Sequence, residues 1–121
     1  MIDFPQVTVH GSCVEMSGNA VLVRGASGSG KSSLCLQLMG FGARLIADDR
    51  TVLTCKNGVV IGSAPTALSG LIEARGMGLL HAAPAPPTPV ACVIDLDVTE
   101  TERMPVPSNT HVLGVTLPRF H

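Results

Sequence analysis

The residues best suited to chemistry form one stretch with the spacing G-x-x-x-x-G-K-S: Gly25, Ala26, Ser27, Gly28, Ser29, Gly30, Lys31 and Ser32. This spacing is typical of a phosphate-binding loop, in which glycines let backbone N–H groups turn toward phosphate oxygens. We expect Lys31 to reach the β- and γ-phosphates of a nucleotide, and the Ser32 hydroxyl to join the shell of a Mg²⁺ ion. The alternative is a glycine-rich turn with an incidental lysine, but a strand-like segment before the stretch and a helix-like one after it favour the loop.

Two adjacent carboxylates, Asp48 and Asp49, follow the apolar segment 43–47. In a phosphate-loop fold, an acid at the carboxyl end of a neighbouring strand holds Mg²⁺ or the water bound to it. Because side chains alternate along a strand, one carboxylate can face the nucleotide while the other faces a neighbouring group. A solvated turn at the end of a strand is an equal alternative on this local pattern.

Three further residues have chemistry that depends on what they face. His10 precedes a glycine in a β-prone segment, which favours a partly exposed residue beside a bulge over a functional one. Glu73 and Arg75 lie two residues apart and are followed by glycines. They can place opposite charges beside a phosphate, but an exposed ion pair is the more common outcome of such a pattern.

The elements that must position these residues follow from hydrophobic spacing and turn residues. A hairpin that turns at Ser17-Gly18-Asn19 is predicted to lead into the loop, and a helix over 31–40 is predicted to pack on the sheet. A second hairpin, from 51–55 to 59–61, is predicted around Asn57-Gly58. The remaining expectations are a strand over 43–49, helical spacing over 66–74, a proline-rich connection over 82–89, a central strand over 90–96, an irregular polar segment over 97–109 and a last strand over 112–117.

Length and composition bound the class of protein. The 121 residues are 45% apolar and 2% aromatic, which predicts one domain over 1–121 with an aliphatic core. A formal net charge of -1 with scattered basic residues predicts no nucleic-acid partner. Four cysteines without C-x-x-C spacing favour free buried thiols in a reducing compartment over a zinc site. Because no signal peptide is evident and prolines interrupt the most apolar region, 78–96, we expect no membrane span and a cytoplasmic location.

Four motifs occur in a fixed order, and they are His10-Gly11, GASGSGKS over 25–32, Leu45-Ile46-Ala47-Asp48-Asp49 and Ile72-Glu73-Ala74-Arg75-Gly76-Met77-Gly78. Together they resemble the C-terminal catalytic domain of HPr kinase/phosphorylase. The resemblance covers 7–80 well and the remainder poorly. The family usually has a further N-terminal domain and C-terminal helices, so the sequence is most similar to a short single-domain form. The resemblance implies an α/β P-loop nucleotide-binding fold with a mixed sheet and flanking helices, related to phosphoenolpyruvate carboxykinase.

The resemblance also implies how the nucleotide side of the site works. Residues 25–32 would bind ATP or, in the reverse direction, inorganic phosphate. Arg75, which belongs to the same signature as Glu73, would also contribute to nucleotide binding. The residues that would hold Mg²⁺ are Ser32, Asp48 and Glu73.

On the acceptor side, the family's substrate is a serine of HPr, the small phosphocarrier of the sugar phosphotransferase system. One aspartate of Asp48 and Asp49 would accept the serine proton, with His10 close enough to adjust it. Arg103 resembles, by order and loose similarity, the arginine of the flexible loop that closes over the phosphate. The family's hexamer implies a homo-oligomer.

Two functions follow from the sequence. The first is an ATP-dependent serine kinase, with phosphorylase activity in reverse, acting on HPr or a related phosphocarrier and serving regulation. The second is a nucleotide- or phosphate-binding regulatory module with weakened catalysis that acts through a partner protein. The set of His10, Asp48, Asp49, Glu73 and Arg75 favours the kinase, whereas the missing C-terminal helices favour the module.

Overall fold

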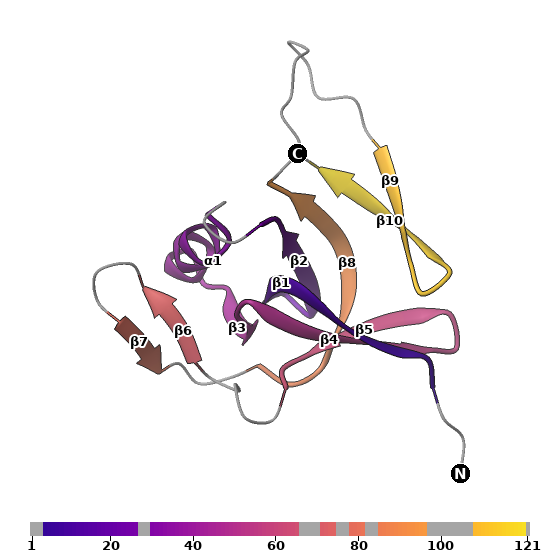
Figure 1. The fold of residues 1–121 in the computed structure, drawn as a ribbon, viewed down its shortest axis with the longest axis horizontal. Coiled ribbons are helices and arrows are strands. Elements are labelled where there is room, and N and C mark those ends of the chain that lie inside the picture. The colour runs from indigo at the N-terminus through magenta and orange to yellow at the C-terminus, as the bar shows by residue number, and fades with distance from the viewer. Residues whose placement is uncertain are drawn as a thin grey trace.

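The computed structural model of the protein describes residues 4–26, 30–65, 71–74, 78–81, 85–96 and 108–120, and for 71–74 and 78–81 it describes the backbone. Its elements are β1 (Gln6–Met16), β2 (Asn19–Arg24), α1 (Lys31–Gly40), β3 (Arg44–Ala47), β4 (Arg50–Lys56), β5 (Val59–Ser63), β6 (Leu71–Ala74), β7 (Gly78–His81), β8 (Thr88–Asp95), β9 (Ser108–Val112) and β10 (Val115–Phe120). Within the described ranges α1 is the one helix (Figure 1). The fold is therefore a mixed α/β fold in which strands dominate.

An eight-stranded mixed sheet curls until two of its strands meet. The strand order is β2-β1-β4-β5-β8-β10-β9, with β3 pairing on β1. β8 also pairs in parallel with β2, from Ala20 opposite Val90 to Arg24 opposite Asp95. Strands β1, β2, β4, β5 and β8 therefore form a closed ring, and the β9–β10 hairpin extends from β8 (Figure 1). β6 and β7 pair with each other in a separate sheet, and β6 lies against α1.

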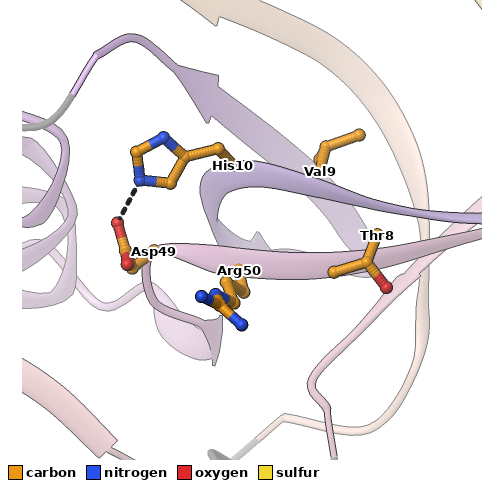
Figure 2. A pocket seen from close by; sticks show the side chains of 5 residues that line it. All are labelled: Thr8, Val9, His10, Asp49 and Arg50. Atoms are coloured by element: carbon orange, nitrogen blue, oxygen red, sulfur yellow. Dashed lines mark hydrogen bonds and ion pairs between the residues drawn. The ribbon is translucent and has the colours of Figure 1, made fainter.

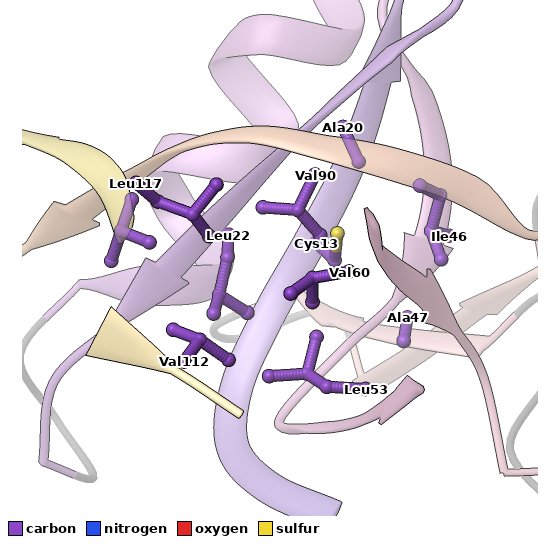
Figure 3. Packing of buried hydrophobic residues seen from close by; sticks show 11 residues of the cluster. Cys13, Ala20, Leu22, Ile46, Ala47, Leu53, Val60, Val90, Val112 and Leu117 are labelled. Carbon is purple, nitrogen blue, oxygen red and sulfur yellow. The ribbon is translucent and has the colours of Figure 1, made fainter. Parts of the chain in front are cut away.

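Side chains that alternate along β1 and β2 fill two cores on opposite faces of the sheet. Cys13 and Leu22 belong to the core inside the ring, whereas their neighbours Val14 and Val23 pack with Cys35 of α1 on the outer face. The buried cluster inside the ring, drawn in Figure 3, contains Cys13, Ala20, Leu22, Ile46, Ala47, Leu53, Val60, Val90, Val93, Val112 and Leu117. Burial on both faces explains the continuous apolar run over residues 20–23 of β2.

Both predicted hairpins are confirmed. The β1–β2 turn has positive φ at Ser17 (52°) and Gly18 (83°), and the β4–β5 turn has positive φ at Asn57 (52°) and Gly58 (78°). Two-residue turns of this kind match the right-handed twist of the strands that they join, and they need residues that tolerate positive φ. The turn chemistry therefore fixed these two registers.

The predicted helix over 31–40 is confirmed with its bounds, and so is its packing on the sheet. Gly30, with φ 101°, precedes its first turn. At the other end Gly42 has φ 103° and donates to the Met39 carbonyl at 3.0 Å, while Ala43 donates to the Leu38 carbonyl at 3.0 Å. This pair of bonds is a Schellman ending, which explains how the helix stops before β3.

The helical spacing predicted over 66–74 is wrong for its described part. Residues 66–70 lie outside the described ranges, and Leu71–Ala74 is strand β6, paired antiparallel with β7 so that Ile72 lies opposite Leu80. A short apolar segment fits a strand as well as a helix, and the cross-strand partner decides between them. The sequence analysis did not predict β7.

The last strand predicted over 112–117 is also wrong, because the chain turns within it. β9 ends at Val112 and β10 begins at Val115, with φ 49° at Leu113 and 80° at Gly114 between them. Gly114 is the one turn-favouring residue between Val112 and Val115, and its apolar neighbours concealed the hairpin.

The prediction of a central strand over 90–96 is confirmed, since β8 pairs with β2, β5 and β10. β8 begins earlier than expected, at Thr88, and includes Pro89 opposite Ile61. It therefore takes in the end of the predicted proline-rich connection, of which 82–84 lie outside the described ranges.

The segment 97–109 was predicted to be irregular. Its residues 108 and 109 belong to β9, and 97–107 are not among those described.

The cysteines are free, as predicted, but burial is confirmed for two of them. Cys13 and Cys35 are buried, whereas Cys55 and Cys92 are partly exposed. No helix in the described ranges is long and apolar enough to cross a membrane.

Candidate functional site

β1 pairs with two strands in succession at the centre of the candidate site. Residues 6–10 pair with β4, and residues 13–15 pair with β3. β3 and β4 therefore run as one antiparallel track along β1, interrupted at Asp48 and Asp49. A backbone bond crosses the interruption, from the Gly11 N–H to the Asp49 carbonyl at 2.9 Å. The two acids thus lie beside the middle of β1, and not at a free strand end.

The interruption is a tight turn that separates two consecutive side chains. Asp49 has φ 67°, and the Arg50 N–H donates to the Asp48 carbonyl at 2.7 Å. This left-handed conformation is uncommon for residues with a side chain, and aspartate is among those that adopt it most readily. The backbone therefore sends the two carboxylates in different directions.

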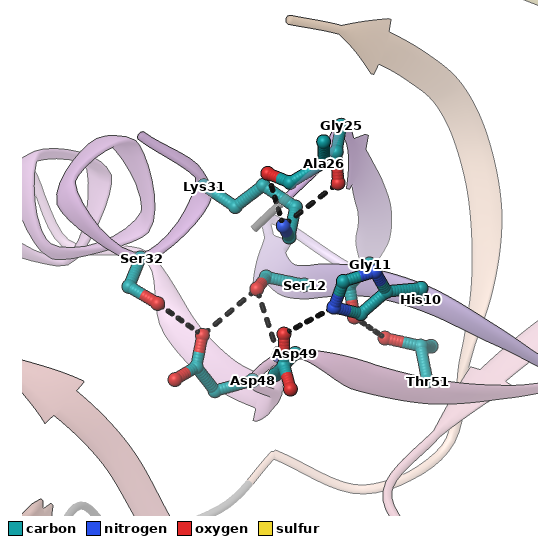
Figure 4. Close-up of polar contacts among 10 residues, drawn as sticks. All are labelled: His10, Gly11, Ser12, Gly25, Ala26, Lys31, Ser32, Asp48, Asp49 and Thr51. Carbon is teal, nitrogen blue, oxygen red and sulfur yellow. Dashed lines mark hydrogen bonds and ion pairs between the residues drawn. The ribbon is translucent and has the colours of Figure 1, made fainter. Parts of the chain in front are cut away.

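The carboxylates of Asp48 and Asp49 have different partners (Figure 4). Asp48 is buried, and its Oδ1 accepts hydrogen bonds from the hydroxyls of Ser12 at 2.8 Å and Ser32 at 2.7 Å. The Asp49 side chain is 56% exposed, and its Oδ1 lies 2.7 Å from Nε2 of His10, which is 51% exposed. Asp48 thus faces the first turn of α1, and Asp49 faces His10 and solvent.

Lys31 is the buried cation of the site. Its Nζ donates to the carbonyls of Gly25 at 2.7 Å and Ala26 at 3.0 Å, and the residue is 5% exposed. Residues 27–29 lie outside the described ranges, so the loop is seen at its two ends. Carbonyl oxygens carry no net charge, so they do not neutralise the positive charge of the Lys31 ammonium. That charge remains available to a phosphate group. The residues present therefore fit a bound polyphosphate.

A cavity of ≈ 410 Å³ opens beside the exposed carboxylate (Figure 2). It is lined by Thr8, Val9, His10, Asp49 and Arg50. The side chains of His10 and Asp49 face each other at one end of this cavity, and Arg50 brings a positive charge beside them. This arrangement can receive a polar group from another molecule next to a carboxylate.

Ser32 and Asp48 supply adjacent oxygen ligands of the kind that Mg²⁺ prefers. Among the described side chains, no group of three or more His, Cys, Asp or Glu residues gathers around a possible metal position. Magnesium in nucleotide sites is commonly held by one or two protein groups together with phosphates and water. The pair Ser32 and Asp48 therefore fits Mg²⁺ that arrives with a nucleotide.

Six predicted site residues are not placed with their side chains. Glu73 lies in β6, for which the structure describes the backbone. Arg75 and Arg103 lie outside the described residues, as do Ser27, Gly28 and Ser29 of the loop. Their roles stay predictions.

Ser12 is part of the site, and sequence reasoning missed it. Its side chain is fully buried, its hydroxyl donates to Asp48, and it accepts the Asp49 N–H at 3.0 Å. The available signal was a serine inside an apolar strand, immediately after His10-Gly11. Such a residue needs a hydrogen-bond partner when it is buried.

Cys35 lies behind the site in α1, and its thiol is unsuited to nucleophilic chemistry. Burial, together with the smaller effect of the nearby negative charge of Asp48, raises its pKa to about 12. A thiol that stays protonated is a weak nucleophile. The chemistry of the site therefore rests on its oxygen and nitrogen groups.

Comparison with protein families gives a match over most of the chain. The family model described as "HPr Serine kinase C-terminal domain" matches residues 4–85. These residues include β1, the loop, α1 and the two aspartates.

Two curated relatives, both named HPr kinase/phosphorylase, match the same part. The protein of Clostridium botulinum (strain Eklund 17B / Type B) is 41% identical over 76 residues, which are 63% of this chain and 25% of that protein. The protein of Geobacillus sp. (strain WCH70) is 42% identical over 78 residues, which are 64% of this chain and 25% of that protein. The chain thus spans about a quarter of the length of the curated relatives that it matches.

A solved structure is similar over a longer range. The structure titled "Structure of the Hpr(Ser) kinase/phosphatase from Coxiella burnetii" superposes with a TM-score of 0.82 at 26% identity, covering 94% of this chain and 83% of that chain. The match therefore extends past residue 85, into the part of the chain where β8, β9 and β10 lie.

Proposed function

This chain belongs to the family of the HPr serine kinase C-terminal domain, and from that premise we propose that it transfers the γ-phosphate of ATP to a serine of HPr or of a related phosphocarrier protein. The proposal includes the reverse reaction, in which inorganic phosphate removes the phosphate from the serine. It treats 1–121 as a single P-loop kinase domain of the type related to phosphoenolpyruvate carboxykinase. A regulatory role in the cytoplasm, a homo-oligomeric state and the absence of nucleic-acid and membrane partners belong to the same proposal.

The observation that carries this proposal is the division of Asp48 and Asp49 between two sides of one site. Asp48 is bonded to Ser32 of the loop motif, and Asp49 is paired with His10 beside an open cavity. A phosphoryl transfer needs a charged cradle on one side and a group that orients the acceptor on the other. Asp48 lies on the side proposed for the nucleotide, and Asp49 lies on the side proposed for the acceptor serine.

On the nucleotide side, residues 25–32 would hold the phosphates of ATP. Lys31, now bonded to two loop carbonyls, would turn to the β- and γ-phosphate oxygens. The hydroxyl of Ser32 and the carboxylate of Asp48 would hold Mg²⁺, which neutralises charge on the transferred group when it is bound. We assign Glu73 to the same metal and Arg75 to the nucleotide.

On the acceptor side, the exposed Asp49 is the better placed base. Its carboxylate would accept the serine proton as the serine oxygen bonds to the γ-phosphorus and the bond to the β-phosphate oxygen breaks, which leaves ADP. His10, 2.7 Å from Asp49, would hold the carboxylate toward the acceptor. In reverse, the protonated Asp49 would return the proton to the serine oxygen. We assign Arg103 to the closing loop over the phosphate.

Transfer of phosphate from γ-labelled ATP to a purified HPr-like carrier tests the proposal. We expect label on the carrier, and none on a carrier whose acceptor serine is replaced by alanine. Binding of ATP without any transfer would contradict the kinase. If carrier binding persisted in that case, the result would support the alternative, a regulatory module that acts through its partner.

Lys31→Ala tests the loop separately from the chemistry. Loss of a charge-assisted bond to phosphate should weaken ATP binding about 10- to 100-fold. Lys56→Ala is a matched control, since Lys56 lies at the far end of β4 over the Phe4 ring. Equal ATP affinity of the wild type and Lys31→Ala in calorimetric titration would show that the loop is not used in this way.

A further inference from the structure

We propose that Ser12 is a positioning residue that sets the two aspartates to their different tasks, an inference that rests on the proposed function. Its hydroxyl touches both acids. It donates to Oδ1 of Asp48 at 2.8 Å and accepts the backbone N–H of Asp49 at 3.0 Å (Figure 4). One side chain on β1 therefore fixes the carboxylate of one acid and the backbone of the next.

The direction of both bonds is determined by chemistry. A serine hydroxyl has one hydrogen to donate and lone pairs to accept with. Because the Asp49 N–H can only donate, it occupies a lone pair of Ser12, and the hydroxyl hydrogen is left for the Asp48 carboxylate. Ser12 is fully buried, so water does not compete for either bond.

The bond to the Asp49 N–H also supports an uncommon backbone conformation. Asp49 has φ 67°, and conformations of this kind persist where the surroundings hold them. Two backbone bonds brace the same turn, from Gly11 to Asp49 and from Arg50 to Asp48. Ser12 adds a side-chain link between this turn and the carboxylate that faces the loop.

Two hydroxyls converge on Asp48 and hold it between β1 and α1. Ser12 approaches Oδ1 from β1 and Ser32 approaches it from the first turn of α1. Without the Ser12 hydroxyl, the Asp48 carboxylate keeps its bond to Ser32 but loses the hydrogen-bonded link through Ser12 to the Asp49 N–H. We therefore expect the distance between the two carboxylates to become variable, which affects transfer more than nucleotide binding.

Kinetics of three variants test this role. Ser12→Ala should lower kcat for transfer to the carrier about 10- to 100-fold, as loss of a supporting partner commonly does. The KM for ATP should change less than about threefold, because the loop contacts remain. Ser12→Thr keeps the hydroxyl and should restore kcat to within about threefold of the wild type.

Thr51→Val is the matched control. Thr51 is equally buried, and its hydroxyl donates to the Gly11 carbonyl at 2.8 Å in the same part of the sheet. This substitution removes a buried hydroxyl that bonds to neither aspartate. If Thr51→Val lowered kcat as much as Ser12→Ala, or if Ser12→Ala raised KM and left kcat unchanged, the positioning role would be overturned.

A second measurement does not depend on activity. Amide hydrogen exchange of Asp49, followed by NMR, should become about tenfold faster in Ser12→Ala, since its N–H loses its acceptor. The Cys55 amide, bonded to the Pro5 carbonyl at 2.9 Å, should keep its rate. Unchanged exchange at Asp49 would overturn the inference. A wild type that transfers no phosphate, together with faster exchange in the variant, would contradict the proposed function and still support the role of Ser12.

Discussion

Two polar junctions in the described sheet each contain an acid that bonds to a residue beside the loop, Asp48 to Ser32 and Asp95 to Arg24. The acidic junction contains Asp48 and Asp49 between β3 and β4. The ion-pair junction contains Arg24 at the end of β2 and Asp95 at the end of β8. In the ion-pair junction, Nε and Nη2 of Arg24 donate to the two oxygens of Asp95, each at 2.8 Å. Among the described residues, the Asp49 carboxylate has no comparable pair of partners, and His10, which lies 2.7 Å from it, is half exposed.

The difference shows that position in the fold does not by itself assign a function to an acid. Asp95 ends a strand parallel to the loop strand, which is the place where a metal-binding acid is expected. Its carboxylate is 12% exposed, and it also lies 3.7 Å from the guanidinium of Arg119. A carboxylate enclosed by two arginines serves to join strands, whereas Asp49 keeps access to solvent.

The largest expected effect concerns the acidic junction. Asp49→Asn removes the proposed base but keeps a residue type that tolerates positive φ, so transfer should fall about 10²- to 10⁴-fold. ATP affinity should stay near that of the wild type. Labelled-phosphate transfer and calorimetric titration measure both quantities, with Asp48→Asn as the companion variant. Full transfer activity in Asp49→Asn would remove it from the proposed chemistry.

The ion-pair junction should respond in stability. Arg24→Ala leaves a largely buried Asp95 without its two-pronged partner, which should lower the free energy of unfolding by about 3 kcal/mol. Urea denaturation measures this loss. Arg44→Ala is the control, because Arg44 is 54% exposed and lies 3.9 Å from Glu15, a kind of pair worth less than about 1 kcal/mol. Equal losses of unfolding free energy in the two variants would show that the bidentate contact stabilises the fold no more than an exposed ion pair does.

Gly11, beside the acidic junction, tests how closely the strands approach there. A Cβ at Gly11 would lie 2.9 Å from the Val23 carbonyl oxygen. Gly11→Ala should therefore cost about 2 kcal/mol, as overpacking does. Gly40→Ala is the contrasting change, since a Cβ there meets nothing within 4 Å in α1. It should leave stability unchanged or raise it by up to about 1 kcal/mol, and thermal unfolding distinguishes the two outcomes.

The smallest effect concerns the buried thiol behind Asp48. Burial raises the pKa of Cys35 from 9.0 to about 12. Between these values the unfolded chain loses a proton that the folded chain keeps, so stability falls as pH rises above 9. The loss should be about 1 kcal/mol for this thiol at pH 10. Cys35→Ala should make the alkaline fall in unfolding free energy shallower, and an unchanged slope would contradict the assignment.

Local signals were enough to predict much of the framework from sequence. Asn57-Gly58 and Ser17-Gly18 marked two turns, and Gly30 and Gly42 bounded the helix. The turn at Leu113-Gly114 was not predicted because the residues on either side of it are apolar. Strand Leu71–Ala74 was not predicted because four residues fit the spacing of a helix as well as that of a strand. The ring closure between β2 and β8 joins distant segments, which no local pattern encodes.

The candidate site was predicted by residue type and not by arrangement. Two adjacent aspartates and His10 were singled out, but which acid faced the loop depended on the left-handed φ of Asp49. Ser12 and the bond from Arg24 to Asp95 are contacts between segments far apart in the chain. The general rule for acids at strand ends applied equally to Asp95, and only its arginine partners distinguish it.

The ring closure has a consequence for the order of folding. The β1–β2 and β4–β5 hairpins join neighbouring segments, whereas β2 must find β8 with residue 20 opposite residue 90. Pairings between distant segments cost more loop-closure entropy and slow folding. We therefore expect the strands around Asp48 and Asp49 to associate before the β2–β8 seam closes. Arg24 and Asp95 would then form their contact after the rate-limiting barrier, so that Arg24→Ala accelerates unfolding in stopped-flow experiments and leaves the refolding rate nearly unchanged.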